Sequence, residues 1–112
     1  SNQLTAIPPE IGQLSALTEL RIEENRLSNL PPEIGQLSAL TRLNLGGNQL
    51  SALPPEIGQL KKLTSLDVGY TKLSSLPTEI GLLINLRYLN LSDTSISPDE
   101  LEKIKEQINN VL

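Results

Sequence analysis

The stretch LPPEIGQLSALTRLNLGGNQL, residues 30–50, places leucine or isoleucine at intervals that fit neither a long helix nor a single strand. The arrangement recurs along the chain. An apolar residue precedes a P-x-E-I-G segment every 23 residues, at Ile7, Leu30, Leu53 and Leu76. Residues 8–18 and 31–41 are the same string, PPEIGQLSALT. Self-similarity at a fixed short period predicts a solenoid, in which stacked coils share one core.

Each repeat contains a short segment of alternating apolar residues, such as Leu43-x-Leu45, which indicates a short strand. One strand per repeat, always in the same chain direction, predicts a parallel sheet with neighbours about 4.8 Å apart. The PPEIG segments must turn the chain on the opposite side, and the fixed φ of proline favours a 3₁₀ or short helical turn there. We expect a glycine to permit the exit from each turn, at Gly12, Gly35, Gly58 and Gly81. These elements predict an α/β fold.

A glutamate in each PPEIG segment forms a column on the outer side of the coils, at Glu10, Glu33, Glu56 and Glu79. The column has two explanations. It is either a cation-binding stripe or a set of carboxylates near the positive ends of short helical turns. We favour the second explanation and expect no metal site.

An asparagine follows the strand in the early repeats, at a position that faces the core. Asn2, Asn25 and Asn48 occupy this position, and Thr71 and Thr94 replace them in later repeats. A buried amide without a partner destabilises a fold by roughly 1–3 kcal/mol. We therefore expect a ladder, in which each amide bonds backbone groups in its own coil and the next. The ladder should be weaker at threonine, whose hydroxyl reaches less far.

The composition excludes several classes of function. The sequence contains no Cys and no His, which removes disulfides, zinc–thiolate sites and thiol nucleophiles. No phosphate-binding loop is present, and Asp67 and Asp93 lack an acid–base partner, so we expect neither an enzyme nor a cofactor. The nine Lys and Arg are scattered, which argues against nucleic acid as a partner. No apolar run approaches the roughly 20 residues of a membrane span. The absence of Cys and of a visible signal peptide favours a cytoplasmic location.

These repeats resemble the leucine-rich repeat family. The family motif L-x-x-L-x-L-x-x-N-x-L appears at residues 17–27 and 40–50 and, with Thr in place of Asn, at 63–73 and 86–96. The LPPEIGQLxxL variant is similar to the 23-residue repeats of bacterial multi-repeat proteins, plant intracellular proteins, Ras-pathway scaffolds and Roco-type GTPases. The resemblance implies a short right-handed superhelix with the sheet on its concave face, where ligands are usually held. It also implies a protein or peptide partner.

We assign residues 1–96 to the repeats, the first of which is partial because the chain opens in the middle of a repeat. No amphipathic cap precedes it, so Leu4, Ile7, Ile11 and Leu14 are expected at a raw end. Such an edge can pair with a second copy of the chain.

We assign residues 97–112 to a capping helix that covers the last coil. Ser97, Pro98 and Glu100 form a capping box, which predicts a helix over about 98–111. Its apolar face would hold Leu101, Ile104, Ile108 and Leu112. An amphipathic helix for a membrane or a partner is the alternative, and its mixed charges argue against a membrane.

Side chains that alternate with the inward leucines should line the concave face. The candidate binding residues there are Glu19, Arg21, Glu24, Arg42, Asn44, Asp67, Tyr70, Tyr88 and Asn90. Tyr70 and Tyr88 are the only aromatic residues in the chain, and Tyr and Arg are favoured at binding hot spots. A purely structural explanation remains open, because Glu19 can pair with Arg42 across the strands and Tyr is a good strand residue.

Two hypotheses for function follow. The first is a protein-interaction module that binds on its concave face, as part of a larger signalling or scaffold protein. The second is a structural or self-associating repeat scaffold, natural or engineered to a consensus, which the long identical strings favour.

Overall fold

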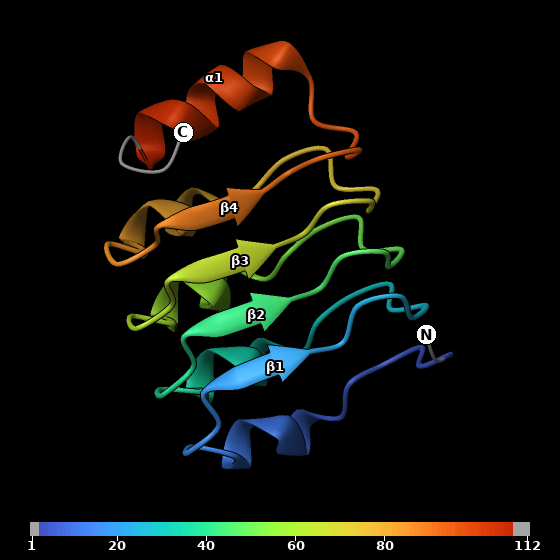
Figure 1. The fold of residues 1–112 in the computed structure, drawn as a ribbon, viewed down its shortest axis with the longest axis vertical. Helices are drawn as coiled ribbons and strands as arrows, with labels where there is room; N and C mark the ends of the chain where they lie inside the picture. Colours follow the sequence, from blue (N-terminus) through green and yellow to red (C-terminus); the bar gives the residue numbers. More distant parts are fainter. Residues whose placement is uncertain (1–2, 109–112) are drawn as a thin grey trace.

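The computed structural model describes residues 3–108, and within them four short strands form one parallel sheet in the order β1-β2-β3-β4. The strands are β1 (Glu19–Arg21), β2 (Arg42–Asn44), β3 (Ser65–Asp67) and β4 (Tyr88–Asn90). Figure 1 shows them stacked along the long axis of the molecule. Each strand pairs with the next at an offset of 23 residues, which aligns Leu20, Leu43, Leu66 and Leu89. The predicted parallel sheet of a solenoid is thereby confirmed.

The PPEIG segments and their PTEIG counterpart form 3₁₀ turns in a second layer behind the sheet (Figure 1). These turns are η1 (Pro9–Gln13), η2 (Pro32–Gln36), η3 (Pro55–Gln59) and η4 (Thr78–Leu82). A proline in extended conformation precedes each turn, as at Pro31 with φ −72° and ψ 151°. Proline suits this place because its ring fixes φ and it has no N–H to leave unpaired at the start of the turn.

The glycines of these turns have a different role from the one that the sequence suggested. None of them has a positive φ, so they do not serve to reverse the chain at the turn exit. At Gly12, Gly35 and Gly58 the reason for glycine is the close approach of the next coil, whereas a Cβ at Gly81 would meet only ordinary contacts. A Cβ at Gly35 would lie 2.7 Å from the Glu56 carbonyl oxygen, and one at Gly58 would lie 2.7 Å from the Glu79 carbonyl oxygen. Real Cβ atoms do not approach oxygen so closely.

The asparagine ladder joins each coil to the preceding coil, not to the following one as expected. Asn48 Nδ2 donates to the carbonyl oxygens of Leu45 in its own coil and Ile22 in the preceding coil, both at 2.9 Å. Its Oδ1 accepts from the Leu27 amide at 3.0 Å. Asn25 accepts from the Leu4 amide in the same way. The Asn48 side chain points toward the preceding coil. The spacing of residues in the sequence does not show toward which neighbouring coil a side chain points.

Threonine at the ladder position bonds only within its own coil. Thr71 Oγ1 donates to the Val68 carbonyl oxygen at 2.8 Å, and Thr94 Oγ1 donates to that of Leu91 at 2.9 Å. The ladder between coils is therefore present in the early repeats and lost in the later ones. Asn2, the earliest predicted member, lies outside the described residues.

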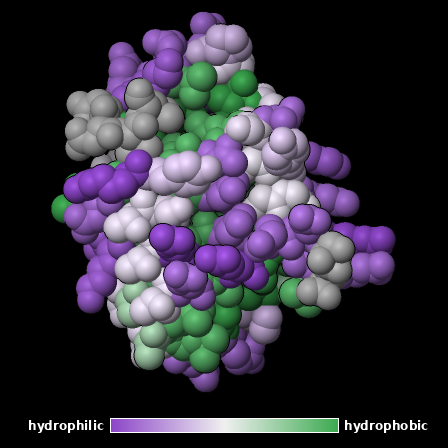
Figure 2. Space-filling view, viewed as in Figure 1, coloured by the Kyte–Doolittle hydropathy of each residue, from purple (hydrophilic) through white to green (hydrophobic). Residues whose placement is uncertain are grey.

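The core consists of aliphatic side chains stacked in columns between the sheet and the 3₁₀ turns. It is fully closed in the middle repeats, where Leu43, Leu45, Leu66 and Val68 are buried. At the N-terminal end Leu14 is 50% exposed, and Leu17, Leu20 and Ile22 are only partly buried. Figure 2 shows hydrophobic side chains gathered at this end of the molecule, where η1 lies. Of the four residues expected at an open end, Leu4 and Leu14 are exposed, whereas Ile11 is partly buried and Ile7 is buried in the core.

A helix, α1 (Pro98–Gln107), covers the other end of the core. Ser97 Oγ accepts from the Glu100 amide at 3.1 Å, and Ile104 and Ile108 are buried against the last coil. The helix is shorter than the predicted 98–111, because Ile108 leaves the helical conformation with φ −131° and ψ 61°. Residues 109–112, including Leu112, lie outside the described residues.

Residues 3–108 contain neither a membrane-spanning helix nor a group of side chains that could hold a metal ion. The described helices are too short or too polar to cross a membrane. The acidic residues of the described part do not come together in threes at a spacing that could hold a metal ion.

Candidate binding face

The sheet presents its outward side chains in columns that run across the four strands. Register places Glu19, Arg42, Ser65 and Tyr88 side by side in one column and Arg21, Asn44, Asp67 and Asn90 in the next. The residues between these two columns are the inward leucines, since side chains alternate along a strand. All outward strand residues of the sequence prediction therefore share one face.

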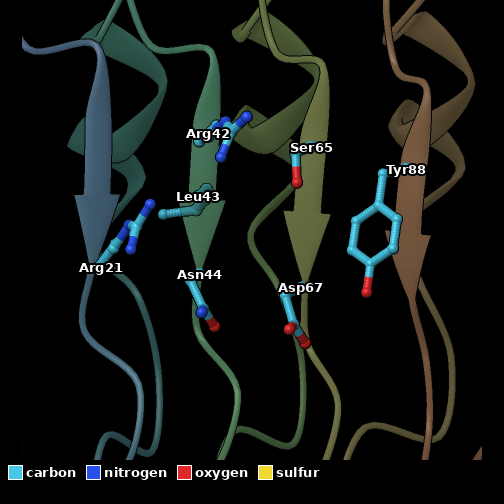
Figure 3. A pocket seen from close by; sticks show the side chains of 7 residues that line it. All are labelled: Arg21, Arg42, Leu43, Asn44, Ser65, Asp67 and Tyr88. Carbon is cyan, nitrogen blue, oxygen red and sulfur yellow. The ribbon is translucent and has the colours of Figure 1, made fainter.

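The first column and its neighbour enclose a hollow of about 230 Å³, which we name the arginine–tyrosine hollow. It is lined by Arg21, Arg42, Leu43, Asn44, Ser65, Asp67 and Tyr88. Figure 3 shows the two arginines arriving from β1 and β2 and the Tyr88 ring from β4, with Ser65 and Asp67 of β3 between them. The side chains come from four strands, so the hollow depends on the register of the whole sheet.

Glu19 does not line this hollow but holds the arginines that do. Its Oε1 lies 3.4 Å from Arg21 Nη2, and its Oε2 lies 3.9 Å from Arg42 Nε. All three side chains are well exposed, so each pair stabilises the fold by under about 1 kcal/mol. The two guanidinium groups are thus matched by the carboxylate of Glu19 beside the hollow and by that of Asp67 in its lining, so the charges of this hollow balance.

A second hollow, of about 420 Å³, adjoins the first toward the ends of the strands. We name it the glycine-floored hollow. It is lined by Glu23, Glu24, Asn44, Gly46, Gly47, Asp67, Tyr70 and Asn90. Asn44 and Asp67 line both hollows, so the two form one continuous depression. The described residues that line the second hollow include three carboxylates and neither Lys nor Arg.

One column of this second hollow has left-handed backbone conformation, which the sequence analysis did not predict. Glu24, Tyr70 and Asp93 have φ of 57°, 57° and 55°, and Gly47 has φ of 71°. A residue with a Cβ loses roughly 1–2 kcal/mol in this conformation. At Glu24, Gly47 and Tyr70 the backbone is held there because the amide donates to the next coil, as from Tyr70 N to the Ser92 oxygen at 2.7 Å. Gly47 was the one signal in the sequence, since glycine adopts this conformation readily.

Three predicted binding residues also stabilise the ends of their strands. Asn44, Asp67 and Asn90 each use Oδ1 to accept from the backbone amide two residues later, at 2.9–3.1 Å. Such bonds are typical of Asn and Asp where a strand turns. The other polar atom of each side chain makes no hydrogen bond within the described residues. These side chains can therefore contribute to the fold and to a ligand at once.

The structure brings eight of the nine predicted binding residues into the two hollows, and Glu19 lies beside them. It adds residues that the sequence analysis had not proposed as binding residues: Glu23, Leu43, Gly46, Gly47 and Ser65. Two of these, Gly47 and Ser65, lie in the same columns as predicted residues, and Glu23 and Gly46 share a neighbouring column, so the 23-residue register could have found all four. Leu43 could not have been found, because its side chain is buried in the core.

Comparison with known proteins places this face in context. A family model described as leucine rich repeat matches residues 1–50 and 38–96. A leucine-rich repeat protein of Leptospira interrogans is similar over 99% of this chain, with 46% sequence identity and a TM-score of 0.97. An internalin of Listeria monocytogenes, InlF, is similar over 98% of this chain, with 28% identity and a TM-score of 0.83. This chain spans 28% and 31% of those two chains.

The functional domain of InlJ from Listeria monocytogenes, which includes a cysteine ladder, is similar over 85% of this chain and 19% of its own. Its identity of 24% and TM-score of 0.73 show a common fold. No curated protein matches this chain. The family match, the 23-residue register and the sheet backed by 3₁₀ turns agree, and the chain belongs to the leucine-rich repeat family.

Proposed function

We propose that this protein is a protein-interaction module that holds a protein or peptide partner on the concave face of its sheet. The observation that carries the proposal is the pair of adjoining hollows, each with an exposed tyrosine at its wall. Tyr70 is 65% exposed and Tyr88 is 52% exposed, and the chain has no other aromatic residue. Aromatic side chains that lie on the surface instead of packing in the core, and that gather on one face, are typical of binding surfaces.

The residues of this face suit binding better than catalysis. The chain has no His or Cys, and its two hollows hold hydrogen-bonding groups, charges and rings spread over four repeats. Such a spread gives a broad contact area and does not converge on one reacting atom. We therefore propose a non-enzymatic role for this domain.

The test uses the purified protein as bait in a lysate beside two double variants. Arg42→Glu with Tyr88→Ala changes the arginine–tyrosine hollow. Lys62→Glu with Ile84→Ala is the matched control, because both residues are exposed and lie away from the hollows. It makes the same change of charge and also removes an apolar side chain. All three proteins must first show the same melting temperature.

We expect the parent and the control to capture the same protein and the concave-face variant to lose it. Capture by both variants would place the contact elsewhere and contradict the proposal. Failure of the parent to capture any protein would favour the second function, a self-associating scaffold. The identical strings at residues 8–18 and 31–41 support that second function, because near-identical repeats are typical of a structural scaffold.

A further inference from the structure

The glycine-floored hollow contains a slot about one side chain wide. Its column runs from Glu24 in the first full repeat through Gly47 to Tyr70, and neighbouring strands of a parallel sheet lie about 4.8 Å apart. The walls of the slot are therefore about 10 Å apart at the backbone. Gly47 has no side chain to fill the space between them. The Glu24 side chain leans over it, since its Cγ would lie 3.2 Å from a Cβ at Gly47.

The charges around the slot select the kind of group that can enter it. Glu23, Glu24 and Asp67 line the hollow, and none of them belongs to an ion pair among the described residues. An acidic side chain would be repelled there. An apolar side chain would remove water from the carboxylates without offering them a hydrogen bond or an opposite charge. A cation is the complementary occupant.

Tyr70 at the side of the hollow favours a cation that can stack on an aromatic ring. Tyr70 is the most exposed aromatic residue of the chain, and it shares the hollow with the three carboxylates. Lysine and, more often, arginine are attracted to the faces of aromatic rings. The planar guanidinium of arginine can also bond a carboxylate through two N–H groups.

The backbone at Tyr70 does not require a tyrosine, because Glu24 and Gly47 adopt the same left-handed conformation in the preceding repeats. Tyr70 has φ of 57°, which is unfavourable for a bulky residue, whereas the preceding repeat has Gly47 at the same position. Both amides donate to the next coil, Gly47 to the Gly69 oxygen at 2.9 Å and Tyr70 to the Ser92 oxygen at 2.7 Å. Glycine would thus keep the backbone and relieve the strain.

We propose that the glycine-floored hollow receives a basic side chain, arginine above lysine, from the protein that docks on the concave face. The ring of Tyr70 and the carboxylate of Glu24 flank the cation, and Asp67 faces it from the third repeat. This inference rests on the proposed function, because it names the chemistry of the partner at the same face.

The experiment titrates the ¹⁵N-labelled protein with N-acetyl-arginine amide, N-acetyl-lysine amide and N-acetyl-glutamine amide, and it follows backbone amide shifts by NMR. We expect the arginine probe to give saturable shifts at Gly46, Gly47 and Tyr70 with Kd in the millimolar range, as befits so small a ligand. Lysine should bind more weakly and glutamine should not bind. The shifts should shrink in 1 M salt, where screening is strong.

The repeats themselves supply variants that preserve the fold. Asp67→Asn removes the charge and keeps the bond to the Gly69 amide, since Asn44 and Asn90 make that bond in neighbouring repeats. Tyr70→Gly copies Gly47. We expect Asp67→Asn to weaken binding of the arginine probe roughly threefold. Tyr70→Gly should weaken it about fivefold and leave the melting temperature unchanged or raised.

Three results would overturn the inference: equal shifts with glutamine, shifts confined to other parts of the protein, or a lower melting temperature for Tyr70→Gly. The outcome is separable from that of the proposed function. If Tyr70→Gly still captures the lysate partner at full strength, the interaction module stands and the cation site fails. If the arginine probe binds and no lysate partner is captured, the cation site stands by itself.

Discussion

Asn48 illustrates how single residues hold neighbouring coils together. It is 5% exposed, and its amide joins Leu27, Ile22 and Leu45. We expect Asn48→Ala to lower the free energy of unfolding by about 3 kcal/mol, because it leaves buried backbone groups without partners. Asn48→Thr should lower it by only about half as much, since a hydroxyl can keep the bond within the coil, as Thr71 does. Urea unfolding measures both, and equal losses would contradict this account. The sequence predicted these residues as a ladder, but the choice of neighbouring coil depends on side-chain direction, which the period does not specify.

At the scale of elements, α1 shows how one cap closes the core. Ser97 accepts from the Glu100 amide, and Ala has no side-chain acceptor. We expect Ser97→Ala to destabilise the protein by about 1 kcal/mol in urea unfolding, whereas Ser97→Asp keeps an acceptor and should stay within a few tenths. Similar losses in both variants would show that the cap bond contributes little. The start of this helix was predictable because capping is a local pattern. Its end was not, because Ile108 leaves the helix at the point where its side chain packs on the last coil.

The described part of the molecule is asymmetric, with α1 over one end of the core (Figure 1) and exposed or partly buried leucines at the other. If this open end pairs two copies, Leu14→Gln should reduce the rise of average mass with concentration in sedimentation equilibrium. Leu82→Gln is the matched control, because Leu82 is also 50% exposed and Gln59 holds its place in the preceding repeat. The control should associate like the parent. A parent that stays monomeric at high concentration would exclude self-association.

The period of 23 residues predicted the sheet, its register and the columns of the outer face, because these depend only on which residues align. It did not predict the left-handed column at Glu24 and Tyr70 or the division of the face into two hollows. Those features arise from hydrogen bonds between coils and from the volumes of side chains in adjacent repeats. The charge of the first hollow likewise depends on Glu19 reaching both Arg21 and Arg42, which spacing alone leaves open.

The uniform offset between strands also makes the protein divisible into interchangeable parts. Thr41 and Thr64 occupy the same place in consecutive repeats, so removal of residues 42–64 would join Thr41 to Ser65 with the natural local sequence at the junction. Strand β1 would then adjoin β3, and Arg21 would stand beside Asp67 in place of Asn44. The floor glycines Gly46 and Gly47 would be gone, while the kinds of contact inside the coils stayed the same. Loss or gain of one such unit by recombination would thus rewrite the recognition surface in a single step and leave the architecture intact.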